Sequence, residues 1–218
     1  MAFFGFIPSA ALLEKIQFTV QKRNFNDALY VLRDEIALKV NEELLDAILT
    51  DLIHQLPDSD KKDTAEKLAN FIKSSVAVLL KQLMGKADPK IVKNSLLFLE
   101  KSLFTDPQGQ LRMGTTLDES LVTNLKFHYQ HIIAGEKINV ATLAENYKIF
   151  AESIVRHYLH DFNETLELGM IKRKASDLGC NAVIKAVHIA IDKIFPRLNK
   201  DELKILAKYH DSLFFHSN

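Results

Sequence analysis

Apolar residues recur at spacings of three and four along most of the chain, which is the periodicity of an amphipathic α-helix. Two examples cover residues 45–56 and 60–83, and Pro57 and Gly85 stand where these helices should end. Runs of β-branched residues that alternate with polar residues between turn signals are nearly absent, so the sequence predicts no sheet. We therefore expect an all-α fold, a multi-helix bundle of about nine or ten helices.

Side chains that can cap a helix N-terminus precede several of these apolar stripes. The expected helix starts are Ser9, Asn26, Asn41, Asp88 followed by Pro89, and two capping boxes, Thr116 with Glu119 and Asn199 with Glu202. In the second half of the chain we expect a short helix over residues 140–147 and a long helix over residues 151–168. A further helix should cover residues 170–195, and Gly179 is a point where it could break.

Residues 105–116, which read TDPQGQLRMGTT, interrupt the helical periodicity with one proline and two glycines. Such a segment is typical of a loop. We therefore expect a linker between an N-terminal helical subdomain, residues 1–104, and a C-terminal helical subdomain, residues 117–218. The two halves could form separate layers or one continuous domain, and the chain shows no repeat of fixed period that would indicate a solenoid.

Composition narrows the class of protein. The chain has 218 residues, of which 47% are hydrophobic, and its 28 Lys and Arg residues balance 28 Asp and Glu residues. The apolar fraction excludes a disordered chain, and zero net charge argues against a polyanion binder that works by bulk attraction. The single cysteine, Cys180, fits a reducing compartment, so we expect a cytoplasmic protein. No apolar run approaches the roughly 20 residues of a membrane span, and residues 1–8 lack the basic residues of a secretory signal.

Residues 140–159 read VATLAENYKIFAESIVRHYL, which resembles the bihelical core of helix-turn-helix regulators. The matching positions are a small residue in the first helix and apolar residues in the turn and second helix: Ala144, Ile149 and Ile154. The resemblance implies a DNA-binding face with Lys148, Ser153 and Arg156, in which Ser153 contacts a phosphate and Arg156 contacts a phosphate or a base edge. Basic and acidic residues balance within residues 140–160, however, so ordinary packed helices are the alternative.

Histidines concentrate in the second half of the chain. Two pairs, His128 with His131 and His157 with His160, have the spacing i, i+3 on separate predicted helices, and Asp161 follows the second pair. Neutral imidazoles that face each other across two helices can bind zinc or iron. A metal-dependent enzyme is therefore one alternative function, and surface histidines without a ligand are the other interpretation.

Phenylalanines cluster near both ends of the sequence: Phe3, Phe4, Phe6, Phe214 and Phe215. They could close the core of their own chain or form the centre of a homodimer interface, where aromatic residues are enriched. The sequence contains no nucleophile elbow, phosphate-binding loop or dinucleotide fingerprint, so it indicates no catalytic residue and no cofactor. We expect a non-catalytic, cytosolic interaction or regulatory protein that binds a protein partner or a second copy through apolar helix surfaces. A DNA-binding regulator and a metal-dependent enzyme are the alternatives.

Overall fold

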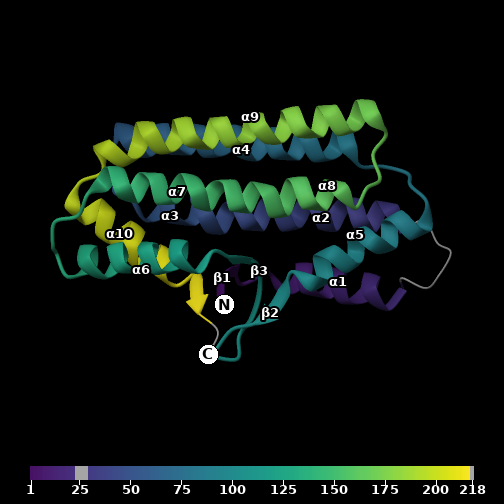
Figure 1. Ribbon diagram of the computed structural model, residues 1–218, viewed down its shortest axis with the longest axis horizontal. Coiled ribbons are helices and arrows are strands. Elements are labelled where there is room, and N and C mark those ends of the chain that lie inside the picture. Colours follow the sequence, from purple (N-terminus) through teal and green to yellow (C-terminus); the bar gives the residue numbers. More distant parts are fainter. Residues whose placement is uncertain (23–28, 217–218) are drawn as a thin grey trace.

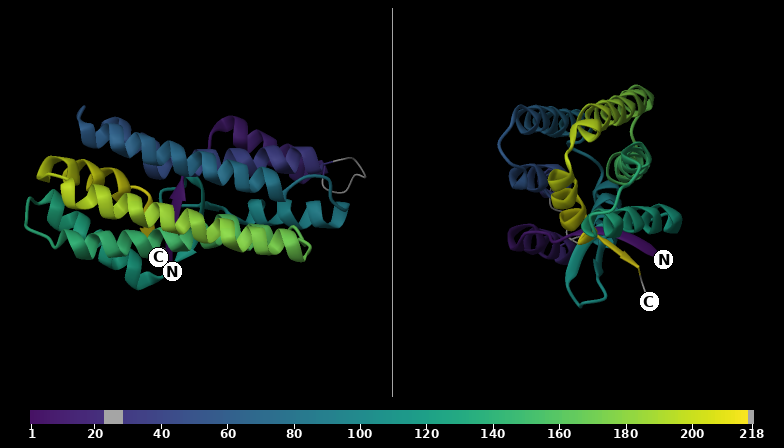
Figure 2. Two further views of the ribbon diagram at one scale, coloured as in Figure 1. Left: turned by 90° about the horizontal axis from the view of Figure 1, so that it is seen from above. Right: turned by 90° about the vertical axis from the view of Figure 1, so that its left-hand side faces the viewer.

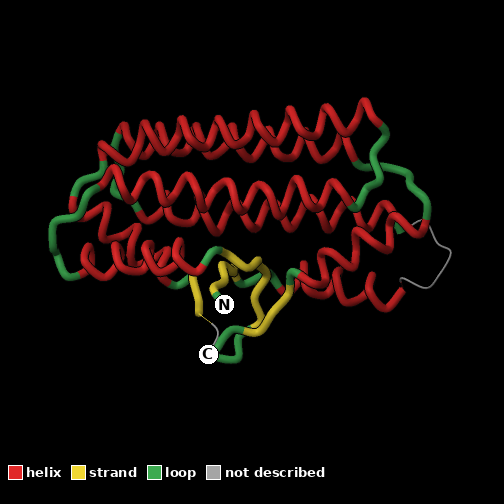
Figure 3. Tube along the Cα trace, in the orientation of Figure 1, coloured by secondary structure: helices red, strands yellow, loops and turns green. Residues whose placement is uncertain are grey.

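The computed structural model describes residues 1–22 and 29–216. The protein is 74% helical and also contains a small four-stranded antiparallel sheet. The expectation of a helical protein is thus confirmed, whereas the expectation of an all-α fold without a sheet is wrong. Figure 3 shows the sheet below the helices, near the middle of the molecule.

The helices and strands alternate unevenly along the chain. The helical elements are α1 (Ala10–Lys22), α2 (Tyr30–Leu45), η1 (Asp46–Thr50), α3 (Asp51–Gln55), α4 (Asp60–Leu83), α5 (Pro89–Lys101), α6 (Glu119–Ile133), α7 (Val140–Val155), η2 (Arg156–Asp161), α8 (Phe162–Glu164), α9 (Met170–Ile194), η3 (Phe195–Arg197) and α10 (Lys200–Asp211). The strands are β1 (Ala2–Phe6), β2 (Leu103–Thr105), β3 (Leu111–Leu117) and β4 (Phe214–His216), in the spatial order β2-β3-β1-β4.

Four long helical columns form the main body of the molecule (Figure 1). They are α2 continued by η1 and α3, α4, α7 continued by η2 and α8, and α9. Helix α4 packs against α2 and α9, and α9 packs against α7. The end-on view in Figure 2 shows these columns as a bundle. In Figure 1 the shorter helices α6 and α10 lie below one end of the columns and α1 and α5 below the other.

The predicted helix starts have mixed outcomes. Ser9, Asp88 and the Asn199 and Glu202 capping box are confirmed, because their side chains accept hydrogen bonds from first-turn backbone N–H groups. Asn41 is wrong as a cap, since it lies inside α2 and donates to the Ala37 carbonyl oxygen. The predicted box at Thr116 and Glu119 is also wrong: Thr116 belongs to β3, and Asp118 caps α6 instead. The predicted cap Asn26 lies outside the described residues.

The helices predicted at residues 140–147 and 151–168 are in fact one column, in which α7 runs from Val140 to Val155 and continues through η2 and α8. The predicted turn is absent because Lys148, Ile149 and Phe150 carry side chains that a helix accommodates, and no glycine or proline interrupts them. Helix α9 likewise passes through Gly179 without a break.

Residues 105–116 form a turn and the strand β3 rather than a structureless linker. β1 pairs with β3 along its whole length and with β4 on its other edge. The sheet therefore joins three distant parts of the sequence. One hydrophobic core contains residues from Ala2 to Phe214, and so includes both predicted subdomains.

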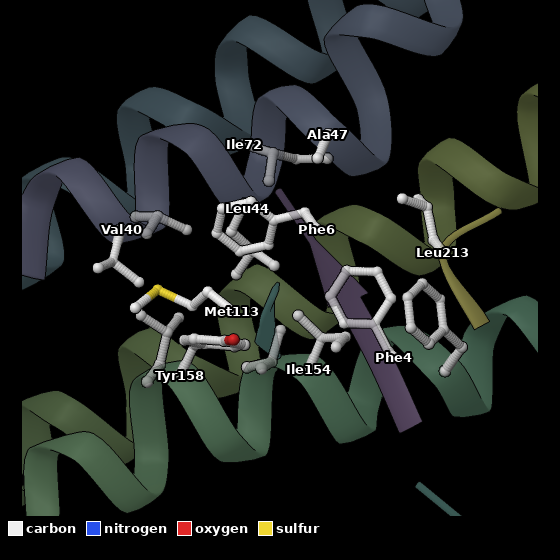
Figure 4. Close-up of a cluster of buried hydrophobic side chains, with 14 of the residues drawn as sticks. Phe4, Phe6, Val40, Leu44, Ala47, Ile72, Met113, Ile154, Tyr158 and Leu213 are labelled. Atoms are coloured by element: carbon white, nitrogen blue, oxygen red, sulfur yellow. The ribbon is translucent and has the colours of Figure 1, made fainter. Parts of the chain in front are cut away.

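The sheet fills the space between two of the long columns. Figure 4 shows Phe6 of β1 and Met113 of β3 between Val40 and Leu44 of α2 on one side and Tyr158 of η2 on the other. Phe6 and Met113 are fully buried there. The sheet thus closes the bundle on the side where α2 and α7 do not pack directly against each other.

Candidate functional site

The interior of the bundle contains a cavity of about 160 Å³. All four long columns and α10 contribute to its wall, and the side chains that line it are almost entirely apolar. The polar or ionisable residues in the lining are Asn41, Tyr147, Tyr158, Glu202 and His210. An interior packed to ordinary density has few voids larger than a water molecule, so a cavity of this volume is an unusual feature of the molecule.

The cavity is long and narrow. On one column its lining extends from Asn41 to Leu56, which corresponds to about 22 Å of helix at the usual rise per residue. On the facing column, α9, the lining extends from Val183 to Ile194. A small volume with a lining of this length is compatible with a linear apolar group.

Both columns that contain π-helical segments place those segments against the cavity. Ile48 and Leu49 of η1 line it from one side, and Tyr158 and Leu159 of η2 line it from the other. A π-helical turn inserts an extra residue into an α-helix and changes the direction of the side chains around it, and such turns frequently occur at functional sites. Here the two insertions shape opposing walls of one space.

Tyr158 is the polar residue of the lining that lacks a partner. Its side chain is 1% exposed, and its hydroxyl makes no hydrogen bond to any described residue. Burial raises the pKa of Tyr158 far above its ordinary value, so the hydroxyl stays protonated and keeps both a donor and an acceptor. A buried hydroxyl without a partner costs about 1–3 kcal/mol.

The polar groups deeper in the bundle, by contrast, are fully bonded. The Nε2 atom of His210 donates to the Ile48 carbonyl oxygen at 3.0 Å, which leaves Nδ1 to accept from the Tyr147 hydroxyl at 2.5 Å. Tyr129 then donates to Tyr147 at 2.8 Å. Burial lowers the pKa of His210 to about 4, so the imidazole is neutral, as this chain of hydrogen bonds requires.

Glu202 is also engaged in structural bonds. Its carboxylate accepts from Lys61 Nζ at 2.6 Å and from the Asn199 backbone N–H at 2.7 Å. Although burial acts to raise its pKa, the hydrogen bonds and the Lys61 charge hold the pKa of Glu202 below its ordinary value. This carboxylate therefore closes a helix cap and does not provide a free acid or base to the cavity.

An open groove of about 600 Å³ lies beside the cavity, between α1, α2 and α4. Asn41, Leu45 and Val76 line both spaces. The two spaces are therefore separated by a thin wall of side chains from α2 and α4. Asn41 contributes the one polar side chain of this shared wall, and it is 5% exposed.

The residues predicted to contact DNA lie on the continuous α7 column, without the turn that a helix-turn-helix motif needs. Lys148 forms ion pairs with Glu145 at 2.9 Å and Asp192 at 2.7 Å. Ser153 donates to the carbonyl oxygen of Ile149, whereas Arg156 is exposed. Lys148 is thus neutralised by two carboxylates.

Two of the five predicted metal ligands, His160 and Asp161, lie close together. With Glu164 they form a group whose ligand atoms are within 4.8 Å of one another. All three are at least partly exposed, and His160 Nδ1 already contacts the Asp161 carboxylate at 3.2 Å. The remaining three predicted ligands bind other groups: His128 the Asn124 carbonyl oxygen, His131 the Glu136 carboxylate and His157 the Ser102 hydroxyl.

The terminal phenylalanines lie in and around the sheet. Phe4, Phe6 and Phe214 are buried in the core of the chain itself, with at most 2% exposure. Phe3 stacks on the ring of Phe104, and Phe215 lies beneath the Arg112 guanidinium. The structure thus places the first three where they close the core of their own chain.

Cys180 is buried as well, and burial raises the pKa of its thiol.

Sequence reasoning did not identify the cavity. Tyr158 belonged to the segment interpreted as a helix-turn-helix, and Asn41 was interpreted as a cap. The available signal was a polar residue on the apolar stripe of each helix, which is compatible with many structures.

None of the helices in the described ranges 1–22 and 29–216 is long and apolar enough to cross a bilayer. Comparison with known proteins finds no matching family model, no similar curated protein and no similar solved structure.

Proposed function

We propose that this protein is a non-catalytic binding protein that takes up an apolar small molecule inside its helical bundle. The observation that carries the proposal is a cavity of about 160 Å³ with an almost entirely apolar lining. An engineered apolar cavity of about 150 Å³ stays dry and binds benzene. A space of this size and polarity is therefore sufficient to bind an apolar group.

The energetics favour an occupant. A ligand that fills the cavity restores the missing van der Waals contacts and stabilises the folded protein in proportion to its concentration.

The chemistry of the lining supports binding rather than catalysis. His210 and Glu202, the two titratable groups with roles in many enzymes, have their polar atoms in structural hydrogen bonds. General acid–base catalysis needs a titratable group within hydrogen-bond distance of the reacting atom and a pKa near the working pH. Neither group meets that requirement in this cavity.

The experiment is a calorimetric titration with dodecanol, a linear apolar probe with one hydroxyl. The blocking variant is Ala190→Leu, because Ala190 lines the cavity from α9. The matched control is Ala182→Leu, an exposed position on the same helix outside the lining. We expect Ala190→Leu to weaken binding at least about tenfold and Ala182→Leu to leave it unchanged. Equal binding by both variants, or no binding by the unaltered protein, would contradict the proposal.

We propose as a second candidate that the outer face of α4 and α9 binds a second copy of the chain. Large apolar side chains are exposed on both helices: Phe71 and Val78 on α4, and Met170, Ile171 and Leu178 on α9. Leu79 of α4 lies against Gly179 of α9, so Val78 and Leu178 are on adjacent turns of packed helices. Exposed apolar residues that lie close together mark interaction surfaces more often than isolated ones do. Light scattering over a concentration series tests this: a dimer that dissociates when Leu178 is replaced by Lys supports the candidate, and a monomer at all concentrations contradicts it.

A further inference from the structure

We infer that the ligand is an anionic single-chain amphiphile, with its alkyl chain in the cavity and its anionic head group in the groove between α1, α2 and α4. This inference rests on the proposed function, because it names the class of molecule that the cavity takes. It is carried by the position of the groove beside the cavity and by the charges that line the groove.

The groove and the cavity adjoin at one end of the cavity. Asn41 and Val76, which line both, are the residues at that end of the lining on α2 and α4. The opposite end is lined by Leu56, Ala65 and Ile194 and by Glu202, whose carboxylate is already bonded to Lys61. A linear ligand that enters through the wall beside the groove would therefore place its distal carbons toward Leu56 and Ile194 and its first polar atoms near Asn41.

The groove is richer in cations than in anions. Its lining contains four lysines, Lys15, Lys39, Lys73 and Lys81, and two carboxylates, Glu35 and Glu42. Lys73 also pairs with Asp46 at 2.5 Å, so one positive charge, that of Lys81, is left without a carboxylate partner among the described residues. The whole chain, by comparison, has a net charge of zero. The groove is thus a local region of positive charge beside an apolar space.

The lysines of the groove can contact an anionic head group at little cost in free energy, because their present ion pairs are weak. Lys15 pairs with Glu35 at 2.9 Å, and both side chains are about half exposed. Lys39 pairs with Glu42 at 2.9 Å with similar exposure. Exposed pairs of this kind contribute about 0–1 kcal/mol, so a stronger anion can replace the carboxylate. Lys81 is exposed and forms no ion pair with any residue in the described part of the chain.

The position of Tyr158 on its column agrees with this arrangement of the lining. Figure 4 shows Met113 of β3 between Tyr158 and Val40, the residue that precedes Asn41 on α2. Tyr158 therefore belongs to the part of the lining toward the groove, whereas Tyr147 and His210 belong to the part nearer α10 and η3.

Calorimetry with three probes of equal chain length separates the contributions of chain and head group. Dodecanol carries the chain alone, dodecanoate adds a carboxylate, and dodecyl phosphate adds a phosphate. All three are used below the concentration at which they form micelles. We expect dodecanoate to bind at least about tenfold more tightly than dodecanol, and we expect added salt to reduce that difference because it screens the lysines. The tighter of the two anions identifies whether the head group is a carboxylate or a phosphate.

A charge reversal in the groove tests the location of the head group. Lys81→Glu lies in the groove, and Lys67→Glu is the matched control, because it is an exposed lysine on the same helix outside the groove lining. We expect Lys81→Glu to weaken dodecanoate binding about three- to tenfold and to leave dodecanol binding unchanged, while Lys67→Glu changes neither.

The outcomes distinguish this inference from the proposed function. Equal affinity for dodecanol and dodecanoate, with no effect of Lys81→Glu, would overturn the head-group inference and leave the apolar binding site in place. Failure of all three probes to bind would overturn both. An equal loss of dodecanoate affinity in Lys81→Glu and Lys67→Glu would show that the charge effect is general and would also overturn the location in the groove.

Discussion

The core beside the sheet and the interior of the bundle are packed very differently. Gly5 and Gly114 face each other across β1 and β3, so closely that a Cβ atom on Gly114 would lie 1.8 Å from the Phe4 carbonyl oxygen. Phe4, Phe150 and Phe214 form a cluster with ring centroids 5.1–5.9 Å apart. The bundle interior, a short distance away, retains a cavity of about 160 Å³. The same chain therefore packs closely where it pairs strands and leaves space where its helices converge.

Polar satisfaction also differs among the buried tyrosines. Tyr129 and Tyr147 are fully buried and hydrogen-bonded to each other, whereas the hydroxyl of the equally buried Tyr158 has no partner among the described residues. Natural proteins leave few buried polar groups unsatisfied. Tyr147 and Tyr158 both line the cavity, so the hydrogen bonding of its wall differs from one part of the lining to another.

The largest expected effect comes from adding one methyl group in the closely packed region. Gly114→Ala should destabilise the protein by more than about 3 kcal/mol, because the new Cβ meets backbone atoms of β1 that cannot move without breaking the pairing. Gly179→Ala should change stability by less than about 1 kcal/mol, since its Cβ meets the side chain of Leu79, which can adopt another rotamer. Urea denaturation of both variants measures this, and equal losses would contradict the contrast.

A second expected effect is acid destabilisation through His210. The folded protein holds its pKa at about 4, whereas the unfolded chain has the usual value of 6.5. The unfolded state therefore binds more protons between these values, and the free energy of unfolding falls as the pH falls from 6.5 toward 4, by about 3 kcal/mol in total. His157, whose pKa burial also lowers, acts in the same direction.

Urea denaturation at a series of pH values measures this dependence. His210→Gln removes the group and should flatten the stability profile, although it also lowers stability at neutral pH because Tyr147 loses its acceptor. His54→Gln is the control, since His54 is exposed and its replacement should leave the slope unchanged. An unchanged slope in His210→Gln would contradict the assignment.

The smallest expected effect comes from removing the bonded hydroxyl of Tyr147 or the unbonded hydroxyl of Tyr158. Tyr147→Phe should destabilise the protein by about 1 kcal/mol, because both Tyr129 and His210 lose a partner. Tyr158→Phe should leave stability unchanged or raise it by about 1 kcal/mol, since it removes an unsatisfied group. Thermal denaturation compares the two, and a clear loss in Tyr158→Phe would show that its hydroxyl is bonded in solution.

The helices were largely predictable because their signals are local. Asp88 with Pro89, and Asn199 with Glu202, fix helix starts through contacts within one turn, and both are confirmed. The strands were not predictable in this way. β1 is covered on both faces and paired on both edges, so its sequence AFFGF shows no alternation of apolar and polar residues, and its partners are more than 100 residues away along the chain.

The candidate site could not be predicted because it is a property of the packing between columns. Asn41 has the side chain of a good cap, and only the structure shows it inside a helix at the wall between cavity and groove. Tyr158 occupies an ordinary position on an apolar stripe, and its missing partner becomes evident only when the neighbouring columns are in place. Residues 140–160 resembled a known motif, yet Lys148 and Phe150 continue the helix through the expected turn.

The position of β1 between β3 and β4 has a consequence for folding during synthesis on the ribosome. β4 emerges from the exit tunnel about 200 residues after β1, so the strand at the centre of the sheet has one edge open for most of synthesis. Until then, Ala2, Phe4 and Phe6 would expose apolar side chains and unpaired backbone N–H and C=O groups to solvent. A nascent chain arrested before β4 should therefore bind chaperones more strongly than one released a few residues later.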